Sequence, residues 1–445
     1  MGQPEQAESN GQVVLDEDVL REPGESATQE DGEGRDDDFE PLPERSWRTT
    51  GDFVGVAVVA VVAVVASLVV WFTSDARNTV SQVGSSQVNP LQPVTVLPPS
   101  LAESWRAPSS ATPVPVNLDS VVVTGDGGEV VGRDARTGEV RWRYARDWPL
   151  CTVSTAWGRV FAVHRKDTNC SEVTTLEAAS GKRGPQRNGD AELGTRLLNE
   201  GSHVLTTGES FVEVYRRDDL VRSMEYGRLR AIVNAGKQPR PDCTYGSFAV
   251  TGGKVAVLER CYSQDPSDRL TVLKPNPEKS DEPQVISTTV VGEKGTRVVA
   301  VTATRVAVAM PGKLVVFDAD TGGLVSEHAV DVTAAELEGD PPGRVVPTFT
   351  STANTYWFTG SKTIALSSAD LAPLWVVDGT LGAGTTLAGQ LLVPTPTGLK
   401  VVDQVSGGQV AEIPVDRGDY RGPVEMATEG PVVLEQRGDT LVALR

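Results

Sequence analysis

The chain of 445 residues has few of the side chains from which active sites are commonly built. It contains three histidines and four cysteines, and aromatic residues make up 5% of it. The histidines lie far apart in the sequence, without the spacing of a zinc site. A net charge of −19 argues against nucleic acid as the main partner. This composition leaves little material for a metal-dependent or histidine-based active site.

Negative charge is concentrated in residues 1–50, which hold 15 Asp and Glu residues against four Arg. The segment is poorly hydrophobic and cannot bury enough apolar surface to offset the entropy of ordering it. We therefore predict a disordered acidic tail over residues 1–50. Thr28 has acidic neighbours, so phosphorylation of the tail is an alternative to a purely solubilising role.

Residues 53–72 form an apolar run of 20 residues without a charge. About 20 residues cross the hydrocarbon core as a helix, and in lipid even a Val-rich backbone must satisfy its own hydrogen bonds. We predict a transmembrane helix over residues 51–73, with lipid bilayer contact through residues 53–72. A cleaved signal peptide is the alternative, but a long acidic segment precedes the run, which exceeds a typical signal core.

The charges that flank this run favour one orientation. Arg45 and Arg48 precede it, whereas only Arg77 follows closely, so the positive-inside rule favours a cytoplasmic N-terminus. All four cysteines follow the run, as expected for a domain in an oxidising compartment. We predict a single-pass protein of the cytoplasmic (plasma) membrane with an extracytoplasmic C-terminal domain. Residues 74–100 are rich in Pro, Ser and Gln, and predict a linker.

From residue 101 the pattern changes to short β-branched strands separated by turns. The clearest repeat unit is a strand, an Asp-x-x-Thr-Gly turn and a Trp eight residues after the Asp. Asp and Thr side chains can hold such a turn by local hydrogen bonds, and Gly supplies a positive φ. The period is in the mid-forties, the size of a four-stranded propeller blade. The residues of this motif are Asp134, Thr137, Gly138 and Trp142, then Asp318, Thr321 and Gly322, then Trp375, then Asp403 and Gly407.

The two ends of the repeat region complement each other. Residues 432–445 form a hairpin without an outer strand, while residues 101–107, which include Trp105, form an outer strand with nothing before it. Together they would complete one blade and close the ring, which removes the free sheet edges. We predict an all-β domain over residues 101–445, an eight-bladed β-propeller. Seven blades are the alternative if residues 185–240 hold less than one blade.

The four cysteines allow three disulfide connectivities. Cys243 and Cys261 are nearly equidistant from the turn at 252–253, so they lie almost opposite each other in one hairpin. Cys151 and Cys170 are not directly opposite across the turn at 157–158, but the loop over residues 165–169 can bring Cys170 back. We favour these two pairs over the other two connectivities.

The repeat resembles the pyrroloquinoline-quinone-type propeller repeat, Ala-x-Asp-x-x-Thr-Gly-x-x-x-Trp, over about residues 101–445. The whole chain is similar to single-pass extracytoplasmic propeller proteins of actinobacteria. This family includes quinoprotein dehydrogenases and non-enzymatic members, such as the propeller lipoprotein of the outer-membrane assembly machinery. The resemblance implies adjacent cysteines, a carboxylate-rich calcium site and a more regular Trp set in the dehydrogenases. This sequence has no adjacent cysteines.

We therefore predict a non-catalytic scaffold, or a module that recognises a ligand or protein, at the cell envelope. It would have no catalytic residues, cofactor or metal site, and its partner would be an envelope protein or a cell-wall ligand. The Trp residues are interpreted as a core that locks the blades. The alternatives are a quinone-dependent oxidoreductase and an envelope sensor that signals to the cytoplasmic tail.

Overall fold

The computed structural model describes residues 49–74, 77–232 and 234–445, so the predicted tail lies almost wholly outside the described residues. Helix α1 (Thr50–Thr73) contains the predicted span and is long and apolar enough to cross a membrane. The backbone N–H and the hydroxyl of Thr49 both donate to the Asp52 carboxylate at 2.8 Å, which fixes the start of the helix. The chain divides into one unit that ends at Val69 and a second, Val70–Arg445.

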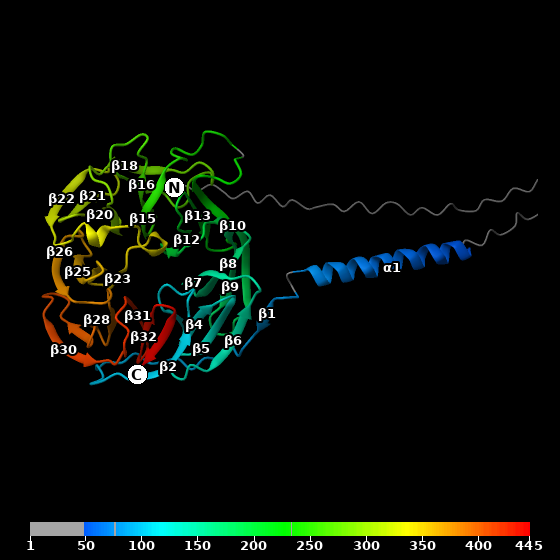
Figure 1. Cartoon of the computed structure of the whole chain (residues 1–445), viewed down its shortest axis with the longest axis horizontal. Coiled ribbons are helices and arrows are strands. Elements are labelled where there is room, and N and C mark those ends of the chain that lie inside the picture. Colours follow the sequence, from blue (N-terminus) through cyan, green and yellow to red (C-terminus); the bar gives the residue numbers. More distant parts are fainter. Residues whose placement is uncertain (1–48, 75–76, 233) are drawn as a thin grey trace, which may run out of the picture. The chain divides into compact units, whose positions relative to one another are not determined.

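The second unit is an eight-bladed β-propeller (Figure 1), as predicted. The seven-bladed alternative is wrong, because residues 197–227 form a complete blade of four strands. Each blade is an antiparallel sheet whose first strand lies nearest the axis. The blades are numbered 1–8 here along the chain.

The strands of blades 1–4, from the inside outward, have the following bounds: blade 1, β3 (Val116–Leu118), β4 (Val121–Asp126), β5 (Glu129–Asp134) and β6 (Val140–Ala145); blade 2, β7 (Leu150–Ala156), β8 (Arg159–Lys166), β9 (Asn169–Glu177) and β10 (Arg183–Ala191); blade 3, β11 (Leu197–Asn199), β12 (His203–Thr206), β13 (Phe211–Arg216) and β14 (Arg222–Gly227); blade 4, β15 (Thr244–Thr251), β16 (Lys254–Arg260), β17 (Arg269–Leu273) and β18 (Val285–Val290).

The strands of blades 5–8 follow in the same order: blade 5, β19 (Arg297–Val301), β20 (Arg305–Met310), β21 (Lys313–Asp318) and β22 (Leu324–Ala329); blade 6, β23 (Thr348–Thr350), β24 (Asn354–Phe358), β25 (Lys362–Ser367) and β26 (Pro373–Asp378); blade 7, β27 (Thr385–Leu387), β28 (Gln390–Thr395), β29 (Gly398–Val402) and β30 (Gln409–Pro414); blade 8, β31 (Val424–Glu429), β32 (Val432–Arg437), β33 (Thr440–Leu444) and β2 (Glu103–Pro108).

Blade 8 closes the ring with strands from both ends of the domain. Its outer strand, β2, pairs antiparallel with β33, and Trp105 lies opposite Ala443. The chain ends in the third strand of the blade, where the sequence lacks a fourth. Closure by a shared blade, as the sequence predicts, leaves the ring without a free radial edge.

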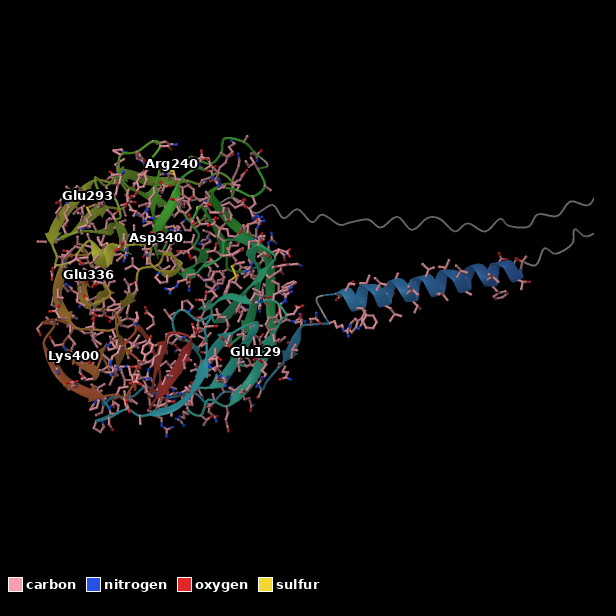
Figure 2. The ribbon with its side chains drawn as sticks, in the orientation of Figure 1. Glu129, Arg240, Glu293, Glu336, Asp340 and Lys400 are labelled. Atoms are coloured by element: carbon pink, nitrogen blue, oxygen red, sulfur yellow. A yellow bond between two sulfur atoms is a disulfide. The ribbon has the colours of Figure 1, made fainter. Side chains whose placement is uncertain are left out.

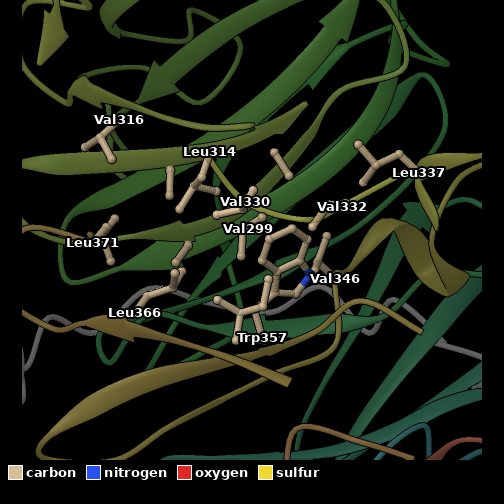
Figure 3. Close-up of a cluster of buried hydrophobic side chains, with 14 residues drawn as sticks. Val299, Leu314, Val316, Val330, Val332, Leu337, Val346, Trp357, Leu366 and Leu371 are labelled. Atoms are coloured by element: carbon tan, nitrogen blue, oxygen red, sulfur yellow. The ribbon is translucent and has the colours of Figure 1, made fainter. Parts of the chain in front are cut away.

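The apolar core is divided into clusters, most of which lie between the faces of adjacent blades. Figure 3 shows the cluster between blades 5 and 6, in which Trp357 of β24 lies beside valines and leucines of both blades. Short β-branched strands suit this arrangement because both faces of each sheet are covered by a neighbouring blade.

The prediction of a linker over residues 74–100 is corrected for residues 80–100, which contact the propeller. β1 (Val80–Gln82) pairs antiparallel with β6 and gives blade 1 a fifth strand. Beyond β1, four partly buried apolar side chains pack against clusters of the propeller. They recur at every third residue, the period of a polyproline II helix, so one edge of this Pro-rich segment faces the blades. We call residues 80–100 the strap; its packed residues are Val88, Leu91, Val94 and Leu97.

A second irregular segment, residues 331–347, connects blade 5 to blade 6 and is called the inner segment. It contains two 3-10 turns, η1 (Ala335–Leu337) and η2 (Pro342–Arg344). Leu337 and Val346 pack in the cluster of Figure 3. Val345 forms a parallel bridge with Phe248 of blade 4. The inner segment therefore reaches from blades 5 and 6 to an inner strand of blade 4.

Candidate functional site

The motif carboxylates are bound to their own turns. The Asp134 carboxylate accepts hydrogen bonds from the backbone N–H groups of Arg136 (2.9 Å) and Thr137 (3.1 Å). Asp318 and Asp403 accept the corresponding bonds in blades 5 and 7. The pKa of Asp318 is lowered chiefly by the backbone N–H of Thr321, and that of Asp403 by the Ser406 hydroxyl. These three carboxylates therefore hold turns in separate blades.

The motif tryptophans join adjacent blades. The indole N–H of Trp105 donates to the carbonyl of Ala135 (3.0 Å) in blade 1, and Trp142 donates to Ala178 (2.7 Å) in blade 2. Trp375 donates to Gln404 (3.2 Å) in blade 7. In each case the acceptor is the first residue after the anchor of the next blade's turn.

The turn glycine of the next blade receives the indole ring. A Cβ at Gly138, Gly181 or Gly407 would lie within 2.7 Å of the ring of Trp105, Trp142 or Trp375, respectively. Each of these glycines also has φ between 71° and 74°. Thr321 and Gly322 form the same turn in blade 5, but no Trp reaches it.

Two junctions use a serine instead of a tryptophan, and the sequence reasoning missed both. The Ser287 hydroxyl of β18 donates to the Ala319 carbonyl (2.8 Å), and Ser223 of β14 donates to the Pro275 carbonyl (2.9 Å). Ser287 lies opposite Val272 at the register position that Trp142 takes opposite Gly132. The sequence pattern was defined by a Trp at this position. Ser is too common in the sequence to mark the position by itself.

Both disulfides join the cysteines that the sequence favoured. Cys151–Cys170 links β7 to β9 within blade 2, with Cα atoms 6.0 Å apart. Cys243–Cys261 flanks the β15–β16 hairpin of blade 4, with Cα atoms 4.6 Å apart. A bulge between Tyr245 and Ser247 shifts the register by one residue, which places Cys243 directly opposite Cys261.

The candidate binding site is a cavity of about 630 Å³ on the axis, which we call the axial cavity. Its wall is supplied by connections between blades, by hairpin turns and by the inner segment. Asp340 of the inner segment lies on the inner side of the ring, whereas Glu293 lies at its outer edge (Figure 2). The residues that line it include Arg196, Arg297, Asp340, Phe358, Glu425 and Asp439.

Arg196 and Glu425 supply opposite charges to this wall from different parts of the ring. Arg196 precedes β11 of blade 3, and Glu425 is the second residue of β31 in blade 8. Burial raises the pKa of Glu425 to about 7, although the charge of Arg196 acts in the opposite direction. Burial also lowers the pKa of Arg196. Both groups are therefore partly desolvated where they face the cavity.

The inner segment fixes one side of the axial cavity. Gly343 packs so closely on Arg196 that a Cβ there would lie 2.3 Å from the Arg196 Cγ. The Thr207 hydroxyl donates to the Gly343 carbonyl at 2.7 Å. Arg344 donates to the Tyr245 carbonyl and to the Asp340 carboxylate. No short motif marks these residues, because they come from separate connections and strand starts.

Among the described residues, no group of three or more His, Cys, Asp or Glu side chains is arranged to hold a metal ion. A carboxylate and a guanidinium in one cavity can bind opposite charges without a metal.

A family model described as outer membrane protein assembly factor BamB matches residues 56–237, which is less than half of the chain. The structure has eight four-stranded blades, and Asp-anchored turns recur among them. The domain is an eight-bladed β-propeller with a PQQ-like repeat. No curated protein matches the chain.

Solved structures with TM-scores above 0.5 share the fold of this propeller at low sequence identity. The computationally designed Ika8 protein is 13% identical with a TM-score of 0.53, over 78% of this chain and 99% of its own. Quinohemoprotein alcohol dehydrogenase ADHIIG from Pseudomonas putida HK5 is 13% identical with a TM-score of 0.51, over 81% of this chain and 78% of its own. BamB from Moraxella catarrhalis is 12% identical with a TM-score of 0.46, over 78% of this chain and 99% of its own.

Proposed function

We propose that the chain is a non-catalytic propeller anchored in the cytoplasmic membrane by α1, which recognises an envelope protein or cell-wall ligand on the extracytoplasmic side. The observation that carries this proposal is the axial cavity, into which a cationic and an anionic side chain face from different blades. Convergent polar groups in a cavity of this size are typical of a binding site.

The repeat residues support a binding role over catalysis. Asp134, Asp318 and Asp403 are engaged in the hydrogen bonds of their own turns, and the motif tryptophans seal junctions between blades. The match to a family named for an assembly factor agrees with a recognition role. Arg45, Arg48 and the placement of all cysteines after α1 support the extracytoplasmic orientation.

Photo-crosslinking in native membranes tests the proposed function. A photoreactive residue at Ser110, an exposed position on the wall of the axial cavity, should give a defined crosslinked product. The same residue at Glu293, on the outer edge, is the control. Addition of Arg196→Gln to the Ser110 probe should abolish the product if the cavity is the recognition site. Equal products from Ser110 and Glu293, both unaffected by Arg196→Gln, would contradict the proposal.

The oxidoreductase alternative is tested separately, because the fold is shared with a quinohemoprotein dehydrogenase. Purified protein should show no saturable change in tryptophan fluorescence or melting temperature with pyrroloquinoline quinone and calcium, and no dye reduction with alcohols. Calcium-dependent saturable binding would favour the enzyme.

A reporter fusion tests the proposed orientation in the membrane. A phosphatase fused after Arg445 should be active, and an inactive fusion would reverse the orientation.

A further inference from the structure

The charged ends of Arg196 and Glu425 have no hydrogen-bond partner among the described residues. The backbone of Arg196 bonds Thr207, but its guanidinium and the Glu425 carboxylate do not form an ion pair within 4 Å. Both groups line the axial cavity. A desolvated charge without a protein partner is costly to maintain, so two of them in one cavity indicate a ligand that supplies the partners.

The other charges of the wall are engaged or exposed. Arg297 donates through Nη2 to the carbonyls of Glu338 (3.0 Å) and Gly339 (3.3 Å). Asp340 accepts from Arg260 and Arg344. The carboxylates of Glu338 and Asp439 belong to exposed residues. The buried Nε of Arg297 has no partner, although its Nη2 is engaged. Among the described residues of the wall, Arg196 and Glu425 are the two charges that are not classed as exposed and whose charged ends form no hydrogen bond.

The two groups are held apart by the fold. They belong to blades 3 and 8, which are three positions apart in a ring of eight, so they approach the axis from widely separated directions. Gly343 restrains the stem of Arg196, and Glu425 lies beside Gln436 in the β31–β32 ladder. They therefore cannot easily collapse into a direct ion pair, and a ligand that bridges them must carry two separated charges.

We propose that the axial cavity binds a small zwitterion, with its carboxylate on Arg196 and its ammonium group on Glu425. This inference rests on the proposed function and specifies its ligand class. An anionic ligand would be repelled by Glu425, and a cationic ligand would leave Arg196 without a partner. The volume of about 630 Å³ lies within the range of small-molecule sites, and Phe358 adds an apolar wall.

Calorimetry with capped and uncapped tri-alanine tests this inference on the full chain in detergent. Tri-alanine carries both terminal charges, whereas N-acetyl-tri-alanine-amide carries neither. We expect saturable binding of tri-alanine and at least tenfold weaker binding of the doubly capped peptide. Equal binding of the two peptides, or no binding of tri-alanine to folded protein, would overturn the inference.

Two variants assign the charges. Arg196→Gln and Glu425→Gln should each weaken tri-alanine binding at least tenfold. Arg187→Gln and Asp378→Asn, exposed residues outside the cavity, are the matched controls and should leave it unchanged. For N-acetyl-tri-alanine, which keeps only the carboxylate, Arg196→Gln should weaken binding and Glu425→Gln should strengthen it. The reverse pattern would overturn the assignment.

The pH dependence adds a readout that a purely structural role would not produce. Glu425, with a pKa of about 7, is progressively protonated as the pH falls from 7 to 5, so tri-alanine binding should weaken over this range. The α-amino group and the carboxylate of tri-alanine stay largely charged over the same range. The other charged side chains that line the cavity with it are Arg196, Arg297, Glu338, Asp340 and Asp439. Glu425→Gln should abolish this dependence, and a dependence that persists in Glu425→Gln would count against the ammonium contact.

These results separate the inference from the proposed function. If the Ser110 crosslink depends on Arg196 but no zwitterionic peptide binds, the zwitterion assignment is overturned and recognition at the cavity stands. If an Arg196→Gln protein does not fold, the peptide series on wild type and on Glu425→Gln still decides the matter.

Discussion

At five junctions between blades, a Trp or a Ser side chain donates a hydrogen bond to the equivalent carbonyl in the turn of the next blade. At the junctions from blade 8 to 1, 1 to 2 and 6 to 7, a Trp donates from its indole N–H and covers the turn glycine. At the junctions from blade 3 to 4 and 4 to 5, a Ser donates the bond but covers little surface. The comparison separates the hydrogen bond, common to both kinds, from apolar burial, which only Trp supplies.

The largest effect is expected where a Trp junction also closes the ring. Removal of residues 440–445 deletes β33, which separates β2 and Trp105 from the rest of blade 8. The domain should lose cooperative unfolding, because both the closure and the 8-to-1 junction are lost. Calorimetry checks this, with deletion of residues 80–82 as the control, since β1 only extends a complete blade. An unchanged transition after the 440–445 deletion would contradict closure by blade 8.

Removal of one tryptophan should cause the next largest loss in the free energy of unfolding. Trp142 is 1% exposed, so Trp142→Ala should lower the free energy of unfolding by about 3–5 kcal/mol in guanidinium titrations. Trp375 is only partly buried, and Trp375→Ala should lower it less. Trp142→Phe keeps much of the burial and should recover part of the loss. An equal loss for Trp142→Ala and Trp375→Ala would show that burial does not distinguish these junctions.

Substitutions at two turn glycines, one covered by an indole ring and one not, can be compared directly. Gly181 and Gly322 both have φ of 71°, so Ala at either position should incur the left-handed strain of about 1–2 kcal/mol. At Gly181 the new methyl would also lie 2.6 Å from the Trp142 ring, whereas at Gly322 the nearest atom is 3.4 Å away. Gly181→Ala should therefore destabilise by about 1–3 kcal/mol more than Gly322→Ala in urea titrations. Equal values would mean that the indole ring moves aside freely.

The smallest effect is expected at a serine junction. Ser287→Ala removes the bond to the Ala319 carbonyl and should lower the free energy of unfolding by about 1 kcal/mol. Ser326→Ala is the control, because Ser326 bonds the His328 ring within its own strand and not the next blade. Equal melting temperatures for Ser287→Ala and Ser326→Ala would show that the bond from Ser287 to the Ala319 carbonyl does not stabilise the junction.

The features that could be predicted from the sequence are those with a local signature. Asp134, Thr137 and Gly138 mark a turn by their types and spacing, and the unmatched Trp105 strand predicted the closing blade. Cys243 and Cys261 could be paired because hairpin geometry is nearly fixed by its turn.

The strap was missed because its regularity has neither a strand nor a helix period. Val88, Leu91, Val94 and Leu97 recur every three residues among prolines, a spacing that is informative only when a polyproline II segment is considered. Arg196 and Glu425 were missed for another reason. They lie in separate connections and strands, and only closure of the ring brings both to the axis.

The pairing of β2 with β33 also sets an order of events during biosynthesis. The Ser104 hydroxyl bonds the Ala443 carbonyl across a sequence separation of 339 residues. At about 5–20 residues per second, the ribosome needs on the order of tens of seconds to make that intervening chain. During this interval β2 emerges with Trp105 unburied and without its partner strand. The ring can be sealed only after synthesis of its last strand, so the nascent propeller passes through an open form in which an early edge must avoid pairing with other chains.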